Sequence, residues 1–209
     1  MTKTLMTFGD SNTHGTPPIE KRGTYARYGV GVRWPTVTYA ALGAGWDMVE
    51  EGLPGRTTAH ADPLMGPHMD GQLGLRIALQ SHGPIDLLTI MLGTNDLKAH
   101  FGLTPEGITA GVAGLLAIAH CDEYQTRHGG FEVMLICPPL ALEQGPLSDV
   151  YYGAAAKSAA LAPLYAGLAR HWRAKFLDAG QHISPSQTDG VHFEPDAHVT
   201  LGRAVAAAI

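Results

Sequence analysis

Five short apolar runs recur along the chain at intervals of roughly 40–45 residues, and this spacing narrows the possible folds more than any other feature. The runs lie at residues 5–8, 46–51, 85–92, 131–137 and 174–180. The last three are mostly continuous rather than alternating, which is typical of parallel strands covered on both faces. Each interval is long enough for a helical crossover between parallel strands. The sequence therefore predicts a five-stranded parallel sheet.

Helical signals fill the intervals between the runs. Residues 33–43 carry a proline near the start and a glycine as a stop, and Thr104-Pro105-Glu106 resembles the first turn of a capped helix. An apolar stripe over 161–172 contains Pro163, which should end or kink any helix begun near Tyr151, and residues 201–209 suggest a terminal helix. The alternation predicts a three-layer α/β/α sandwich around a flavodoxin-like sheet, with residues 1–209 forming a single domain.

Composition excludes several classes of function. The net charge is −5 and no cluster of Lys and Arg is present, so nucleic acid is not an expected partner. The N-terminus lacks a long apolar segment and no apolar stretch approaches 18 residues, so neither a signal peptide nor a membrane span is expected. The two cysteines, Cys121 and Cys137, are too few for a disulfide framework. We therefore expect a globular protein of the reducing cytoplasm.

Two polar groups at predicted strand ends suggest nucleophilic catalysis. Ser11 follows the first apolar run within Gly-Asp-Ser, at the sheet edge where open α/β folds place their chemistry. A lone serine in such a turn more often caps a helix. After the fifth run, however, Asp189 lies three residues before His192. A carboxylate at this spacing can accept the imidazole Nδ1–H and leave Nε2 free as a base.

Two further loops could stabilise an oxyanion. The loop after the second run contains Gly52 and Gly55, either of which could bring a bare backbone N–H close to a ligand. The loop after the third run contains Asn95, whose side-chain amide could donate to a developing negative charge. Because the carboxyl ends of parallel strands share one edge of the sheet, we expect these loops to meet Ser11.

Other site types fit the sequence less well. His192 and His198 with Asp196 between them invite a metal hypothesis, but their spacing fits no common zinc pattern and no HExxH occurs, so no metal is expected. The stretch from Gly9 to Gly15 is not followed by Lys-Ser or Lys-Thr, which excludes a P-loop, and no Gly-x-Ser-x-Gly is present. A non-catalytic, flavodoxin-like binding module remains an alternative from another class.

The four stretches together resemble the conserved blocks of the GDSL-type, or SGNH, hydrolases. They are Gly-Asp-Ser at 9–11, Gly55 in LPGRT, GTND at 93–96 and DGVH at 189–192. The resemblance implies that Ser11 is the nucleophile, His192 the base and Asp189 its orienter. It also implies an oxyanion hole formed by the backbone N–H groups of Ser11 and Gly55 and the side chain of Asn95. Gly55 is chosen over Gly52 because it directly precedes Arg56-Thr57.

Further stretches resemble the bacterial arylesterases that also act as acyltransferases and perhydrolases. These stretches are VRW at 32–34, EEGLPGRTT at 50–58, IMLGTNDLKAHF at 90–101 and the DAG-x-x-IS run at 178–184. Members of that group assemble as octamers, so a homo-oligomer is expected. Position 12 is Asn where the GDSL name expects Leu, and His14 and Thr16 stand where the best-known relatives have tryptophans.

The expected activity is a cofactor-independent serine esterase that acts on acetyl to butyryl and aryl esters, with acyl transfer or perhydrolysis as a further reaction. A carbohydrate O-acetylesterase, acting on xylo-oligosaccharides or similar compounds, is the alternative within the same chemistry. Six residues within or next to the blocks are expected to contact the small ester substrate: Asn12, His14, Leu97, Phe101, Val191 and Phe193.

Overall fold

A computed structural model describes residues 2–209, and its centre is a five-stranded parallel sheet with the order β2-β1-β3-β4-β5. This order is the flavodoxin-like one that the sequence predicted. The strands are β1 (Lys3–Gly9), β2 (Trp46–Gly52), β3 (Leu87–Met91), β4 (Glu132–Cys137) and β5 (Lys175–Asp178). The strands of the sheet therefore coincide with the five apolar runs to within a few residues at each end.

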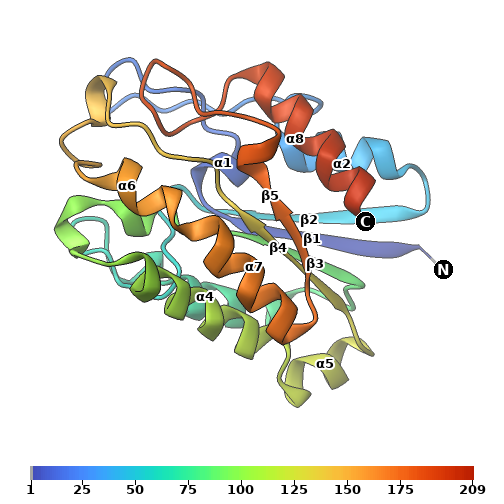
Figure 1. Ribbon diagram of the computed structural model, residues 1–209. Helices are drawn as coiled ribbons and strands as arrows, with labels where there is room; N and C mark the ends of the chain where they lie inside the picture. The colour runs from blue at the N-terminus through green and yellow to red at the C-terminus, as the bar shows by residue number, and fades with distance from the viewer. Residues whose placement is uncertain (1) are drawn as a thin grey trace.

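Helices cover both faces of the sheet (Figure 1). One face is covered by α2 (Trp34–Leu42) and α8 (Pro195–Ala208), which pack against each other. The other face carries α3 (Gly71–Ser81), α4 (Pro105–Ala119) and α7 (Leu161–Trp172), with α4 in contact with both neighbours. The remaining helices are short: α1 (Ser11–His14), α5 (Asp122–His128) and α6 (Ala154–Ala159). This arrangement confirms the predicted three-layer sandwich.

The side chains of β3 explain why its sequence is apolar without interruption. All five residues of the strand are buried. Leu87 and Met91 point into a cluster with Trp34 of α2 on one face, whereas Leu88 and Ile90 belong to the larger cluster on the opposite face. Burial of both faces, at about 25 cal/mol per Å² of apolar surface, favours a central strand over any exposed position.

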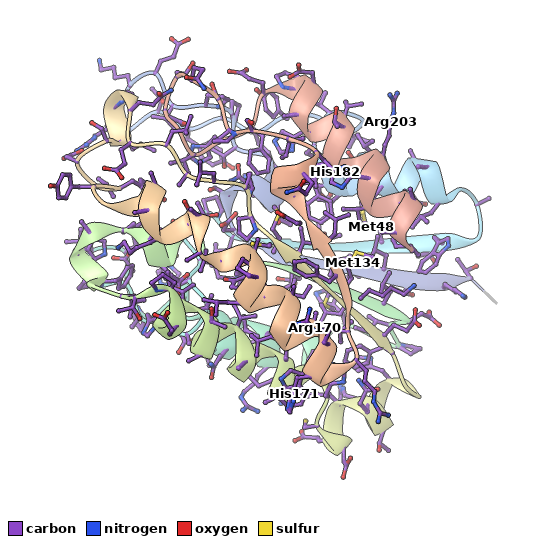
Figure 2. The ribbon with its side chains drawn as sticks, viewed as in Figure 1. Met48, Met134, Arg170, His171, His182 and Arg203 are labelled. Atoms are coloured by element: carbon purple, nitrogen blue, oxygen red, sulfur yellow. The ribbon has the colours of Figure 1, made fainter. Side chains whose placement is uncertain are left out.

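The outer surfaces of the two helical layers carry charged side chains together with a few exposed apolar or aromatic ones: Tyr39 on α2 and Leu73 and Ile77 on α3. Exposed charged or polar side chains include Arg203 on α8 and Arg170 and His171 on α7. Figure 2 shows Arg203 on one side of the sheet and the two α7 residues on the other. Among the described residues, no helix is both long and apolar enough to cross a bilayer.

Several local expectations can be compared with the structure. The terminal helix is present, and the break at Ala160 divides α6 from α7, with Pro163 in the first turn of α7. Two helices, α3 and α5, carried no signal that we identified. Asp70 caps α3 by accepting from the backbone N–H of Gln72, so a capping signal existed at its start.

The topology places a crevice at the carboxyl ends of β1 and β3. These strands are neighbours, yet the chain leaves β1 toward β2 on one side and continues from β3 toward β4 on the other. Ligands of doubly wound sheets bind at such a point of reversal. The segments after β1 and β3 hold Ser11 and Asn95, respectively.

Candidate active site

Ser11 begins helix α1 directly after β1. Asp10 caps this helix, because its carboxylate accepts a 2.9 Å hydrogen bond from the backbone N–H of Asn12. The turn requires glycine at position 9, since a Cβ there would lie 2.8 Å from the carbonyl oxygen of Met91 and would overlap Thr13. The tight turn leaves Ser11 at the edge of the sheet.

Ser11, His192 and Asp189 form a continuous hydrogen-bonded chain. The Nε2 of His192 lies 3.0 Å from the Oγ of Ser11, and the Nδ1 of His192 lies 2.6 Å from Oδ2 of Asp189. All three residues are buried. With Nδ1–H donating to the carboxylate, Nε2 is free to accept the proton of the serine hydroxyl.

The surroundings of Asp189 keep its carboxylate ionised. Oδ1 accepts from the backbone N–H groups of Val191 and His192, and Oδ2 accepts from the backbone N–H of Ile19 at 2.7 Å. Burial alone would raise the pKa of Asp189, but the hydrogen bonds from His192 and Ile19 and the charge of His192 together lower it below its ordinary value. An ionised carboxylate can stabilise the imidazolium that forms when His192 accepts a proton.

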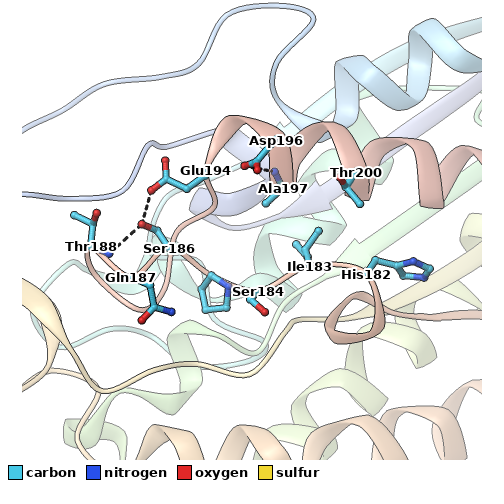
Figure 3. A pocket seen from close by; sticks show the side chains of 11 residues that line it. His182, Ile183, Ser184, Ser186, Gln187, Thr188, Glu194, Asp196, Ala197 and Thr200 are labelled. Carbon is cyan, nitrogen blue, oxygen red and sulfur yellow. Dashed lines mark hydrogen bonds between the residues drawn. The ribbon is translucent and has the colours of Figure 1, made fainter.

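Hydrogen bonds of Ser186 stabilise the loop that carries Asp189 and His192. The backbone N–H of Ser186 donates to the carbonyl oxygen of His192 at 2.7 Å. Its hydroxyl donates to Oε1 of Glu194 at 2.5 Å and accepts from the backbone N–H of Thr188, as Figure 3 shows. The hollow of about 460 Å³ in this view is lined by neither Ser11 nor His192, so it lies outside the hydrogen-bonded chain.

A cavity of about 260 Å³ opens above Ser11 and His192. Its apolar lining consists of Ile19, Pro54, Met65, Leu147 and Val150. Its polar lining, besides Ser11 and His192, consists of Thr16, Thr24, Tyr25, Gly55, Asn95, Lys98 and Tyr151. The cavity is small and its surface is largely apolar. Its lining includes the serine whose hydroxyl is hydrogen-bonded to an imidazole.

The structure separates the two glycines of the second block. Gly55 lines the cavity with φ of +92°, and a side chain there would meet the sulfur atoms of Met65 and Met69. Gly52 instead ends β2, where a Cβ would overlap the backbone of His14. Gly55 therefore lies at the cavity that Ser11 also lines, whereas Gly52 permits close packing of α1 on β2.

Asn95 also lines the cavity, and its amide has partners on both sides. Its Nδ2 donates to the carbonyl oxygen of Arg56 at 3.1 Å and lies 3.4 Å from Oδ2 of Asp10. Its Oδ1 accepts from the hydroxyl of Tyr151 at 3.4 Å. The amide is thus held at the cavity wall between the segments that follow β1, β2 and β3.

Two residues beside the candidate oxyanion donors tie the strand ends together. Arg56 donates to the carbonyl oxygen of Gly9 at 3.0 Å, and its guanidinium lies 4.0 Å from the ring centroid of Phe8. Burial lowers the pKa of Arg56 to about 10. Asp96 accepts from the backbone N–H and the hydroxyl of Thr58, at 3.0 and 2.5 Å. These contacts join the segments of the second and third blocks to the end of β1 and to each other.

A comparison with known protein families identifies the family of the chain. The model of the GDSL-like lipase/acylhydrolase family matches residues 7–200 of the chain. The chain belongs to this family. It is accordingly a carboxylic ester hydrolase, as its motifs predicted.

Solved structures of related proteins resemble this family member along its whole length. The native aryl esterase of M. smegmatis is 37% identical, with 98% of this chain and 97% of that one covered and a TM-score of 0.91. Est24, a carbohydrate acetylesterase from Sinorhizobium meliloti, is 35% identical, with the same coverage and a TM-score of 0.90. A carbohydrate acetylesterase family member from the same organism is 32% identical, covers 98% and 96%, and has a TM-score of 0.88. No curated protein sequence gives a significant match.

None of the six residues expected to contact substrate in this GDSL-like hydrolase lines the cavity. They are Asn12, His14, Leu97, Phe101, Val191 and Phe193. Leu97 and Val191 are buried in the core cluster beneath helices α3, α4 and α7, and Phe193 is buried in the cluster on the opposite face. Their apolar side chains turn inward because burial removes more apolar surface from water than the cavity wall would.

The other three expected contacts have structural roles. The side-chain amide of Asn12 donates to the carbonyl oxygen of Val191 at 3.1 Å, which joins the first block to the last. His14 lies beside the Tyr25 ring, and Phe101 lies against the rings of His60 and His100. The expectation that these residues contact substrate is therefore not supported by their positions.

Several cavity residues carried no sequence signal that we recognised. Tyr151 and Val150 come from the segment between β4 and α6, which contains no motif. Lys98 follows the third block and binds Oδ2 of Asp62 at 3.1 Å. Its position three residues after Asn95 was a usable signal. Within residues 2–209, no group of three His, Cys, Asp or Glu side chains is arranged to hold a metal ion.

Proposed function

We propose that the protein is a serine esterase that hydrolyses acetyl to butyryl and aryl esters through an acyl-enzyme on Ser11. The observation that carries this proposal is the chain of hydrogen bonds from Ser11 through His192 to Asp189 at the cavity. A volume of about 260 Å³ suits small ester groups and lies just below the usual range for sites that hold drug-sized ligands.

The first half of the reaction acylates the serine. The Oγ of Ser11 attacks the ester carbonyl carbon while Nε2 of His192, 3.0 Å away, accepts its proton. Negative charge develops on the carbonyl oxygen, where the N–H groups of Ser11 and Gly55 and the amide of Asn95 can donate to it. The intermediate then collapses, and His192 returns the proton to the departing alcohol.

The second half regenerates the serine. A water molecule gives a proton to Nε2 of His192 and attacks the acyl carbonyl, and the second tetrahedral intermediate expels Ser11 Oγ, which takes the proton back. An alcohol or a peroxide that replaces water at this step gives acyl transfer or perhydrolysis. The cavity wall formed by Ile19, Met65 and Val150 is apolar, so the acyl-enzyme should partition partly to an added alcohol. Thr16 at the same cavity is smaller and more polar than tryptophan and should admit water, so we expect acyl transfer at a rate below that of hydrolysis.

A fluorophosphonate probe tests the nucleophile directly, because it labels only an activated serine. We expect one label per wild-type chain and none on Ser11→Ala, whose kcat for p-nitrophenyl acetate should fall on the order of 10⁴–10⁶-fold. Ser184→Ala is a matched control, since Ser184 is exposed and does not line the cavity. Labelling of Ser11→Ala, or retention of more than roughly a tenth of activity, would refute the proposal.

A carbohydrate O-acetylesterase is a second candidate. The cavity is lined by the hydroxyl groups of Thr16, Thr24 and Tyr25, which can bind sugar hydroxyls, and two of the similar structures are named as carbohydrate acetylesterases. A panel of phenyl acetate, p-nitrophenyl acetate and acetylated xylo-oligosaccharides separates the two functions. A kcat/KM that is higher for the acetylated sugar than for both aryl esters would favour this candidate.

We also propose that the protein is a cytoplasmic homo-oligomer. Tyr25, Leu64, Met65 and Tyr152 are large and exposed, and two of them, Tyr25 and Met65, also line the cavity. An assembly that covered these side chains would narrow the mouth of the cavity, and the resemblance to the octameric arylesterases favours eight copies. Cys121 and Cys137 are free thiols, which suits a reducing compartment. Light scattering would measure the number of copies.

A further inference from the structure

The side-chain amide of Asn95 has a defined orientation in the resting site. Its nitrogen faces two acceptors, the carbonyl oxygen of Arg56 at 3.1 Å and the carboxylate of Asp10 at 3.4 Å. Its oxygen faces a donor, the hydroxyl of Tyr151, at 3.4 Å. A rotation by 180° would place the amide oxygen against both acceptors, although the phenol oxygen can accept an N–H as well as donate. Only one of the two orientations therefore has matched partners.

Tyr151 is suited to be a permanent donor. Its side chain is 4% exposed, and burial, with the charges of Asp10 and Asp189, raises the pKa of its phenol well above the ordinary value. The hydroxyl therefore keeps its proton throughout the pH range in which esterases work. The segment that carries Tyr151 is joined to the segment after Asn95, because the N–H of Ala99 donates to the carbonyl oxygen of Val150 at 2.8 Å.

We propose that Tyr151 is a positioning residue for Asn95. Its hydroxyl holds the amide oxygen, so the amide nitrogen stays at the cavity wall, where its long 3.4 Å contact with Asp10 can be exchanged for a hydrogen bond to the oxyanion of the bound ester. This role rests on the proposed esterase function. A donor on the amide oxygen also polarises the amide and strengthens the N–H bond that it offers. The present 3.4 Å separation is long for such a bond, and hydrogen bonds in empty catalytic sites commonly tighten when the reacting charge forms.

The alternative role for Tyr151 is direct contact with substrate, since it also lines the cavity. The two roles differ in their dependence on Asn95. A phenol that acts through Asn95 has no function once the amide is removed, whereas a phenol that binds the ester or the oxyanion itself keeps its effect. A double-mutant cycle distinguishes these cases.

The first measurement compares Tyr151→Phe with the wild type on p-nitrophenyl acetate. Phenylalanine keeps the ring and removes only the hydroxyl. We expect kcat to fall about 5–20-fold with KM within a factor of two, because the lost interaction matters mainly when the oxyanion forms. Tyr39→Phe is the matched control: Tyr39 lies on α2, is 37% exposed, does not line the cavity, and its change should leave both constants unchanged. Thermal melting checks that each variant is folded.

The second measurement repeats Tyr151→Phe in an Asn95→Ala background. Asn95→Ala alone should lower kcat about 10²–10³-fold. We expect Tyr151→Phe to add less than a twofold further loss there. An unchanged kcat in the single variant, a change confined to KM, or an equal loss in both backgrounds would each overturn the positioning role. None of these results would affect the labelling of Ser11, so the esterase function is tested separately.

Discussion

The backbone N–H of Ile19 donates a 2.7 Å hydrogen bond to Oδ2 of Asp189, the same oxygen that lies 2.6 Å from Nδ1 of His192. Ile19 also forms part of the cavity wall. One residue therefore contacts both the space where an ester would bind and the carboxylate that orients the imidazole. The segment after α1 links substrate binding to the catalytic chain through this single amide.

Replacing Ile19 tests that link. Ile19→Pro removes the N–H, so one of the donors to Asp189 is lost, and we expect kcat to fall about tenfold. Ile19→Ala keeps the N–H and shortens only the side chain in the cavity, so it should change KM while kcat stays within about twofold. Steady-state kinetics on p-nitrophenyl acetate would measure both. Equal kcat values for the two variants would show that the amide has no catalytic role.

The dependence of activity on pH should follow the state of His192. Its imidazole must be neutral to accept the proton of Ser11, so kcat/KM should rise over the acid to neutral range and then reach a plateau. Asp189 remains ionised over this range because its pKa is lowered, so it adds no second transition. Initial rates in constant-ionic-strength buffers would measure the profile. A flat profile, or complete loss of activity with a chelator, would contradict the mechanism.

Ionisation of Asp10 should lower the free energy of unfolding as pH rises from about 4 to 6. Burial raises its pKa from 3.8 to about 6, so the unfolded chain loses this proton first. The sign is therefore opposite to that of a paired carboxylate: ionisation of Asp10 costs the folded state up to about 3 kcal/mol, and the cost is complete above pH 6.

Asp10→Asn should remove this cost, since asparagine can still accept the N–H of Asn12. We expect the unfolding free energy of Asp10→Asn, relative to wild type, to be higher at pH 7 than at pH 4. Urea unfolding at several pH values would measure it. Asp47→Asn, at an exposed position on β2, is the control and should show a much smaller change with pH. The same difference for both variants would refute the assignment to Asp10.

The balance between hydrolysis and acyl transfer should depend on Thr16 rather than on His14. Thr16 lines the cavity, whereas His14 does not. Thr16→Trp would cover more of the mouth with apolar surface and should raise the ratio of benzyl acetate to acetate about two- to fivefold, roughly 0.4–1 kcal/mol in relative barrier height. The measurement is product analysis with vinyl acetate and benzyl alcohol. His14→Trp should leave the ratio unchanged. A larger change in the ratio for His14→Trp than for Thr16→Trp would show that His14, rather than Thr16, borders the cavity.

The sequence by itself determined the sheet and the candidate catalytic residues, because both depend on local patterns. Apolar runs of strand length separated by crossover lengths required parallel strands, and β3 lies within the longest run. The spacing of Asp189 and His192 allowed a carboxylate to reach the imidazole of the same loop, and the structure shows that contact at 2.6 Å. Ser11 and Asn95 followed strands that end at one edge.

Only the tertiary structure decided which side chains reach the ester. Leu97 and Phe193 are apolar and adjoin the blocks, yet both are buried in core clusters, because the direction of a loop side chain depends on the partners available to it from distant segments. Tyr151 lies 56 residues from Asn95 and belongs to no motif, but the packing of its segment brings its hydroxyl to the amide. Contacts of this kind have no local pattern, so they arise only when the strands and helices are assembled.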